Sequence, residues 1–181
     1  MFFHITLVNG AREEVSYFYN VHRGVEQSGS SLGSTMMTKL KADIAESAVL
    51  TKLLRQGYRV LKPVGDRLPY DLGIDTQWGL IRIQVKSAWY CKGMYVVDTR
   101  RTQTNRRMMI RRPYEKNDFD FAICYLEDLD VCYVIPIQEF LSFRSGIAFV
   151  EEQTRQRKPK SYQYREAWAL LHRAAQLETA E

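Results

Sequence analysis

Cysteine and histidine are both scarce in this chain of 181 residues. There are three of each, no two cysteines form a CxxC pair, and the histidines do not cluster. These absences argue against a disulfide framework, a zinc site and histidine-centred catalysis. No apolar run approaches the roughly 20 residues that a membrane helix needs. We therefore expect a reduced cytoplasmic protein with no membrane partner.

Acidic residues are missing from two basic stretches. Residues 100–112 contain six arginines, and residues 153–165 contain three arginines and two lysines. The net charge is +5. Basic charge gathered in this way favours a polyanionic partner, and it also fits a solvated loop face.

The composition changes near residue 36. Residues 24–35 are rich in Gly and Ser and predict a flexible linker. Beyond them, Thr38 is placed to cap a helix that Gly57 would end. The apolar face of this helix is expected at Leu40, Ile44, Val49 and Leu53. We expect residues 1–36 to be a flexible or non-native extension and residues 37–181 to form the compact domain.

Further along the chain, hydrophobic patterns predict several strands and two more helices. Strands are expected at 58–63, 70–75, 80–89, 94–99, 118–126 and 131–137, and helices at 137–143 and 164–177. The last two strands are nearly all apolar and should be central. Five aromatic residues should pack in the core, with subunit contacts as the alternative: Phe119, Phe121, Tyr125, Tyr133 and Trp168. The order of elements predicts an α/β fold, a mixed sheet flanked by helices.

The stretch "YDLGIDTQWGLIRIQVKS", residues 70–87, carries the clearest chemical pattern. Asp71 precedes Gln84 by thirteen positions, and Lys86 lies two beyond, on the same strand face as Gln84. Oxygen ligands and an ammonium group at one place are suited to binding a divalent ion and stabilising charge on a phosphate. Alternatively, Gln84 and Lys86 form the solvated face of a half-buried strand.

An acidic residue on the first helix extends this pattern. Glu46 has the small neighbours Ala42, Ala45 and Ala48, which allow the helix to pack closely. A carboxylate on such a helix can reach a site at the sheet edge. An exposed helical glutamate is the alternative interpretation.

Together these stretches resemble the PD-(D/E)XK nuclease superfamily, and more closely its homing endonucleases from cyanobacterial group I introns. The resemblance covers about residues 37–175 and includes "MTKLKADIAE", "VLKPVGDRLPYDL", "IQVKSAW", "YVVDTRRTQTNRR", "YEKNDFDFAICYLEDL" and "RQRKPKSYQYREAW". It implies a restriction-endonuclease-like core.

The resemblance implies a catalytic set of Glu46, Asp71, Gln84 and Lys86, with Asp71, Glu46 and Gln84 as metal ligands. Gln84 stands where most of the superfamily has an acid, so it offers a carbonyl oxygen without charge. The implied cofactor is Mg²⁺, with Mn²⁺ substituting. The implied partners are double-stranded DNA and copies of the same chain in a homotetramer. An organellar stroma is the implied location if the gene is plastid-encoded.

The basic stretches are the expected DNA contacts. The predicted DNA-binding residues are Arg100, Arg101, Thr102, Gln103, Asn105, Arg106, Arg107, Arg111, Arg112, Arg155, Arg157, Lys158 and Lys160. The expected activity is a site-specific double-strand break at a long, roughly palindromic target. A structure-selective nuclease of the Holliday-junction-resolvase type and an inactive DNA-binding module remain open at this point.

Overall fold

The computed structural model describes residues 4–5, 17–18, 31–65, 67–104, 109–151 and 158–176. The contacts divide the chain into two units, Met1–Thr35 and Met36–Glu181. The first contains a short antiparallel pair, β1 (His4–Ile5) and β2 (Tyr17–Phe18). Within the described ranges, no helix combines the length and apolarity that crossing a bilayer requires.

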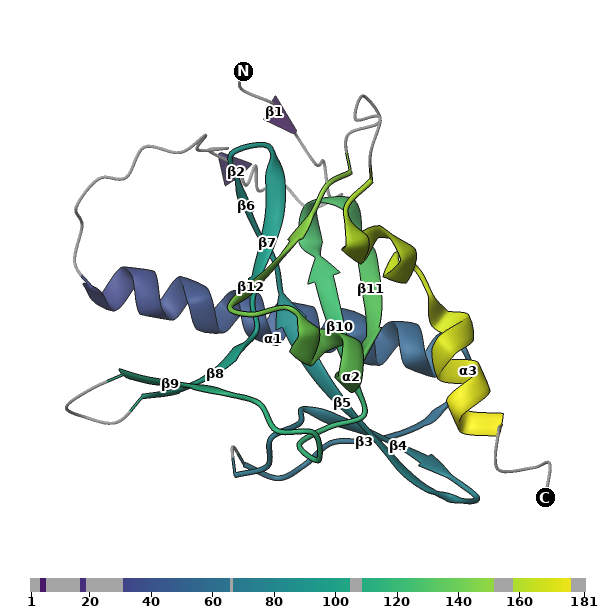
Figure 1. The fold of residues 1–181 in the computed structure, drawn as a ribbon. Coiled ribbons are helices and arrows are strands. Elements are labelled where there is room, and N and C mark those ends of the chain that lie inside the picture. The colour runs from purple at the N-terminus through teal and green to yellow at the C-terminus, as the bar shows by residue number, and fades with distance from the viewer. Residues whose placement is uncertain are drawn as a thin grey trace. The chain divides into compact units, whose positions relative to one another are not determined.

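The second unit is built on a five-stranded mixed sheet of order β11-β10-β5-β4-β3 (Figure 1). Its strands are β3 (Arg59–Leu61), β4 (Leu72–Thr76), β5 (Gly79–Ser87), β10 (Phe121–Leu126) and β11 (Val131–Pro136). The β5–β10 pair is parallel, and the other pairs are antiparallel. The mixed sheet predicted from the sequence is confirmed.

Two smaller sheets and the remaining helices complete this unit. One small sheet has the order β12-β7-β6, from β6 (Trp89–Cys91), β7 (Met94–Asp98) and β12 (Gly146–Phe149). The other is a hairpin of β8 (Arg100–Thr104) and β9 (Met109–Pro113), which extends from the body as an arm (Figure 1). The helices are α1 (Ser31–Arg55), η1 (Glu127–Leu129), α2 (Ile137–Ser142), η2 (Lys160–Tyr164) and α3 (Trp168–Gln176).

Each face of the five-stranded sheet has its own core. On one face, Val49 and Leu53 of α1 and Leu171 of α3 pack with Ile83 and Ile123 of the sheet. The opposite face is covered by α2, β7, β12 and η2. Strand β10 alternates between the two cores and is buried at every position. At the centre of β5, residues 83–85, side chains on either face therefore meet protein, so a polar group there needs a protein partner.

The structure confirms some details of the sequence prediction and corrects others. Of the five aromatics expected in the core, Trp168 is only partly buried and the other four are buried. Cys124 and Cys132 are buried free thiols, whereas Cys91 is exposed.

Helix α1 begins at Ser31, so the prediction of a helix capped by Thr38 after a linker ending at 35 was wrong. Extending a helix N-terminally adds one hydrogen bond per residue fixed, which is far easier than starting a new helix. Leu40, expected on the buried face, is 50% exposed. Among the side chains of α1 that the structure describes, from residue 37 on, those in the core are Ala45, Val49 and Leu53.

Two further corrections concern β11 and the C-terminal region. β11 is an outer strand, and not a central one as predicted. It is nevertheless buried because its two faces pack in the two cores, and Glu166 caps its open edge. The Cys132 amide donates to Glu166 Oε1 at 2.6 Å, and the Glu166 amide donates to the Cys132 carbonyl at 2.8 Å. The helix expected from residue 164 starts at Trp168, because residues 160–164 form the 3-10 helix η2.

Candidate active site

A row of polar side chains lies along one face of β5. Arg82, Gln84 and Lys86 alternate with the apolar residues that face α1, so they point to the other core. Arg82 pairs with Asp120, with Nη2 to Oδ1 at 2.8 Å and Nε to Oδ2 at 3.1 Å. This pair fixes the start of β10. Gln84 and Lys86 have no acidic partner on β10, and they contact groups from other segments.

Asp71 meets Gln84 directly. Asp71 lies one residue before β4, where its amide donates to the Ile83 carbonyl at 2.9 Å. Its Oδ2 accepts from Gln84 Nε2 at 2.5 Å and from the Val85 amide at 2.7 Å. Gln84 Nε2 also donates to the Val85 carbonyl at 3.0 Å. Both amide hydrogens of Gln84 are therefore used, and its carbonyl oxygen is the atom left for a ligand.

The environment of Asp71 disfavours its charged form. Burial raises the pKa of Asp71 from its ordinary 3.8 to about 6, although the hydrogen bond from Val85 acts in the opposite direction. The negative charge of Glu46 contributes to this rise in the pKa of Asp71. Two carboxylates that repel one another, beside a free amide oxygen, form a set of hard oxygen donors that suits a divalent ion. The donor chemistry therefore fits Mg²⁺ or Mn²⁺.

Glu46 and Lys62 form the outer part of this cluster. Lys62 Nζ lies 3.0 Å from Glu46 Oε2, and this bond raises the pKa of Lys62. The Lys62 charge also acts on Asp71. Lys62 was missed in the sequence. Its only signal there is its place directly after a short strand, inside the stretch "VLKPVGDRLPYDL".

Lys86 lies on the same strand but is held by different partners. Its Nζ donates to the Arg100 carbonyl at 3.2 Å and lies 4.8 Å from the centroid of the Tyr114 ring. Burial lowers the pKa of Lys86, while the Asp71 charge opposes that shift. Burial, followed by the Asp71 charge, raises the pKa of Tyr114. The lysine therefore shares the field of the carboxylate cluster without forming an ion pair with it.

The four predicted catalytic residues are thus arranged unequally. Asp71 and Gln84 are in contact, Lys86 acts on Asp71 through charge, and Glu46 does so from α1. Among the described residues, no group of three or more His, Cys, Asp or Glu could hold a metal ion. The candidate donor set is two carboxylates, Glu46 and Asp71, with the amide oxygen of Gln84.

The predicted DNA-binding residues fall in two regions. In the hairpin, Arg100 and Arg111 pair with Asp98, with nitrogen–oxygen distances of 2.9 and 3.5 Å. Arg101 donates to the Leu68 carbonyl at 3.2 Å, and Arg112 is exposed. The backbone places Thr102 and Gln103 on β8; the predictions for Asn105, Arg106 and Arg107 lie outside the described residues.

In the second region, Lys158 and Lys160 have different surroundings. Lys158 is exposed and lies over the Tyr162 ring, 4.4 Å from its centroid. Lys160 is 3.2 Å from Glu139. The predictions for Arg155 and Arg157 lie outside the described residues.

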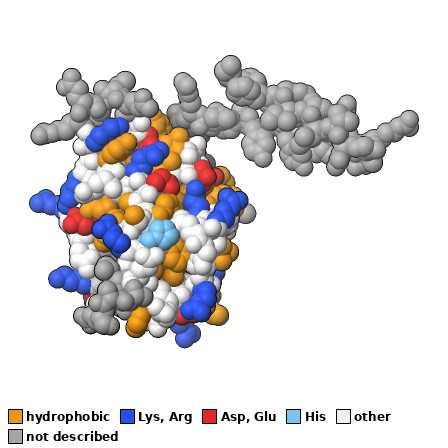
Figure 2. All heavy atoms as spheres, turned by 90° about the vertical axis from the view of Figure 1, so that its right-hand side faces the viewer, with side chains coloured by type: hydrophobic (Ala, Val, Ile, Leu, Met, Phe, Trp, Pro, Cys, Tyr) orange, Lys and Arg blue, Asp and Glu red, His pale blue; other side chains and the backbone are white. Residues whose placement is uncertain are grey.

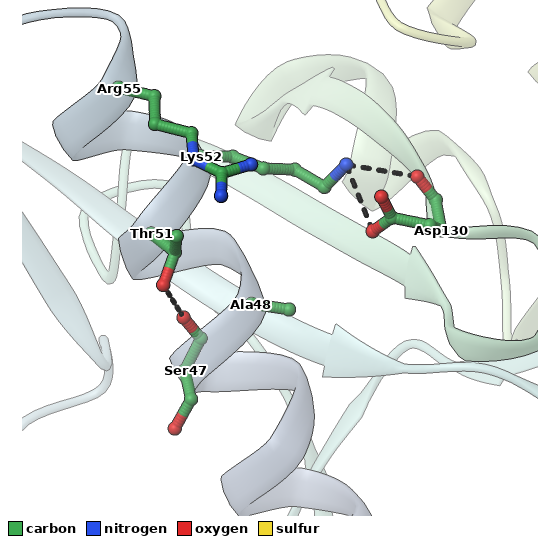
Figure 3. A pocket seen from close by; sticks show the side chains of 6 residues that line it. All are labelled: Ser47, Ala48, Thr51, Lys52, Arg55 and Asp130. Atoms are coloured by element: carbon green, nitrogen blue, oxygen red, sulfur yellow. Dashed lines mark hydrogen bonds and ion pairs between the residues drawn. The ribbon is translucent and has the colours of Figure 1, made fainter.

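Two other surfaces contribute nothing to the cluster. A hollow of about 270 Å³ beside α1 is lined by Ser47, Ala48, Thr51, Lys52, Arg55 and Asp130 (Figure 3). Lys52 crosses it to Asp130 at 3.0 Å. On the side of the molecule where α3 lies, basic side chains stand among hydrophobic and uncharged ones (Figure 2). The described residues of that face form no continuous basic surface.

Comparison with known proteins identifies the class. A family model described as PD-(D/E)XK endonuclease matches residues 36–171. The chain belongs to this endonuclease family, as the polar cluster on β5 and the mixed sheet had indicated. The resemblance seen in the sequence is therefore confirmed.

One solved structure among the matches is described as a bacterial homing endonuclease, I-Ssp6803I. It is 50% identical to this chain with a TM-score of 0.73, and the match covers 80% of this chain and 99% of the other. Curated proteins give no match.

Proposed function

We propose that this chain is a homing-type, site-specific DNA endonuclease, which hydrolyses phosphodiester bonds and makes a double-strand break at a long, roughly palindromic target. The observation that carries the proposal is the Asp71–Gln84 contact beside Lys86, in a chain 50% identical to a homing endonuclease. An inactive DNA-binding module is disfavoured because the carboxylate, amide and ammonium are all present.

Asp71, Glu46 and the Gln84 carbonyl oxygen would hold a divalent ion, Mg²⁺ by preference and Mn²⁺ as a substitute. Such an ion, when bound, supplies a Lewis acid for a phosphoryl oxygen and a more acidic water. The Lys86 ammonium stabilises negative charge that develops on the phosphate, and its partly buried site strengthens that interaction. The exposed arginines of the β8–β9 hairpin hold the DNA backbone.

The metal set has its own test in Gln84→Glu. This variant places the commoner acid of the superfamily next to Asp71. The added negative charge repels that of Asp71, and a bound cation would reduce the repulsion. We expect cleavage to persist and its dependence on Mg²⁺ to remain. A folded Gln84→Glu protein that cuts with neither Mg²⁺ nor Mn²⁺ would show that the neutral amide is required.

Residues 37–181 form the catalytic unit in this proposal, and four copies assemble to read a long site. A domain of this size covers too little DNA alone, and a symmetric oligomer repeats each contact on a symmetric target. Sedimentation of the full chain with and without DNA tests the assembly. A species of one chain on cut DNA would contradict it.

The activity is tested by incubating the protein with Mg²⁺ and two substrates, a pool of linear genomic fragments and a four-way DNA junction. We expect discrete cuts in both strands of linear DNA, none when the metal is chelated, and no preference for the junction. Cleavage of the junction alone would favour a resolvase.

A further inference from the structure

Both ends of the basic hairpin close on the candidate catalytic lysine. Arg100 is the first residue of β8, and Tyr114 directly follows β9. Arg100 pairs with Pro113 across the hairpin, which brings the two ends together. Lys86 Nζ donates to the Arg100 carbonyl and lies over the Tyr114 ring. The base of the hairpin therefore forms the socket in which the lysine side chain sits.

Tyr114 makes one wall of this socket rigid. Its ring packs edge-on against Phe119 and Phe140, with centroid distances of 5.0 and 6.2 Å. The residue is only 6% exposed. A buried aromatic cluster of this kind holds a single side-chain arrangement. The Tyr114 side of the socket is thus fixed by the core.

The other wall is fixed by one carboxylate, Asp98, at the end of β7. Its Oδ1 accepts from the Arg100 amide and from Arg100 Nε, each at 2.9 Å, and its Oδ2 accepts from Arg100 Nη2 at 2.9 Å. Arg111 of β9 lies 3.5 Å from the same Oδ2. Burial opposes the charge, but the bonds from Arg100 prevail and lower the pKa of Asp98. One anion therefore joins β7 to both strands of the hairpin.

The next residue of β8 reaches the other half of the site. Arg101 Nη2 donates to the Leu68 carbonyl at 3.2 Å, three residues before Asp71. The start of β8 thus contacts Lys86 through Arg100 and the segment that leads to Asp71 through Arg101. A shift of the hairpin base moves groups on both sides of the cluster.

We propose that Asp98 is a positioning residue that couples the basic hairpin to the cleavage site. It holds the Arg100 carbonyl against Lys86, and it does so by occupying two arginines, Arg100 and Arg111, that would otherwise be available to DNA phosphates. This inference rests on the proposed endonuclease function. It requires that Asp98 acts in opposite directions on cleavage and on DNA affinity.

The test is Asp98→Asn, which keeps the shape and removes the charge. Single-turnover cleavage of a mapped target is measured with Mg²⁺, and affinity for target and unrelated DNA is measured without metal across a salt series. Weakened hydrogen bonds to a charged group lower the cleavage rate about 10- to 100-fold. Affinity for both DNAs rises, and the salt slope steepens by about one for each arginine that gains a phosphate.

Two further variants separate charge from geometry. Asp98→Glu keeps the charge with a longer side chain, so wild-type affinity and slowed cleavage are expected; it also decides the matter if Asp98→Asn does not fold. Asp75→Asn is the matched control, because Asp75 pairs with Arg59 at 3.4 Å on β3–β4. In this control the cleavage rate and the DNA affinity should both stay within about twofold of wild type, because most surface ion pairs contribute little.

The outcomes are distinguishable. Wild-type cleavage rates in Asp98→Asn and Asp98→Glu would overturn the positioning role, whatever happens to affinity. If DNA affinity, cleavage rate and melting temperature all fall together, Asp98 is a structural residue, and the positioning role is overturned as well. A wild-type protein that cuts no DNA in the same assay would refute the proposed function and, with it, this inference.

Discussion

The candidate cleavage site and the basic hairpin are built in opposite ways. Asp71 and Gln84 are held by a sheet with neighbours on both sides, and each is tied by hydrogen bonds to the protein. The strands of the β8–β9 hairpin pair only with each other. Its described arginines beyond the base, Arg111 and Arg112, are exposed.

The cleavage site has to be ordered before DNA binds, whereas the hairpin does not. Groups that stabilise developing charge must be in place at the moment of reaction, so a packed sheet is the suitable support. A segment that follows a long duplex benefits from few packing constraints and low local stability. The socket around Lys86 is where the two regions meet.

The largest effects on cleavage are expected at Lys86 and Asp71. Lys86→Ala removes the ammonium from a packed site and should lower the cleavage rate on the order of 10²–10³ or more. DNA affinity should stay near wild type, because Lys86 is partly buried and bonded to Arg100. Cleavage and binding are compared on the same duplex, with Lys116→Ala, an exposed lysine, as the control. Near wild-type cleavage by Lys86→Ala would remove the lysine from the mechanism.

Asp71→Asn should abolish cleavage and yet stabilise the fold. The folded-state pKa of Asp71, about 6, lies above its ordinary 3.8. The folded protein therefore binds more protons between these values, and wild-type stability falls as the pH rises through that window. Without metal at pH 8, Asp71→Asn should raise the free energy of unfolding by about 1–3 kcal/mol. Below about pH 4 the gain should vanish.

Urea denaturation with a chelator, at pH 8 and at pH 4, measures this difference. Asp75→Asn in β4, the strand that directly follows Asp71, serves as the control, since no comparable burial acts on that exposed carboxylate. Equal stability of wild type and Asp71→Asn at both pH values would show that the Asp71 site carries no strain.

We expect residues 100–112 to read bases and residues 153–165 to bind phosphates. At least one alanine substitution within 100–112, beginning with Arg112→Ala, should cost roughly 1–3 kcal/mol on target DNA and much less on unrelated DNA. Lys158→Ala and Arg155→Ala should weaken both DNAs alike and reduce the salt slope by about one. If every substitution in 100–112 weakens both DNAs equally, the hairpin is an electrostatic clamp only.

The smallest effect is expected from removing residues 1–36. Among the described side chains of α1, positions 37–43 are exposed and the first one packed into the core is Ala45. A chain beginning at Met37 should bind and cut like the full chain and lose less than about 1 kcal/mol of stability, as for changes away from packed features. A large fall in its melting temperature would show that the extension contributes to the fold.

The sequence predicted the core of the site because strand periodicity alone places Gln84 and Lys86 on one face. The contact with Asp71 depends on the register of β4 against β5, which the short turn between them fixes. The hairpin strands could not be predicted in this way, because residues 100–112 have no alternation of apolar and polar residues. Asp98 was overlooked because it lies just outside the acid-free stretch, where spacing gives no hint that one carboxylate holds two arginines.

Mapping the DNA ends that the protein makes is the sharpest test of site-specific cleavage that depends on Lys86. Wild type and Lys86→Ala are each incubated with a complex pool of linear duplexes and Mg²⁺, and every new end on both strands is sequenced. We expect the DNA ends made by the wild type to map to one long, roughly two-fold symmetric sequence. The reaction with chelated metal and the reaction with Lys86→Ala should each give no new ends above background. Ends without a sequence preference, or the same ends from Lys86→Ala, would contradict it.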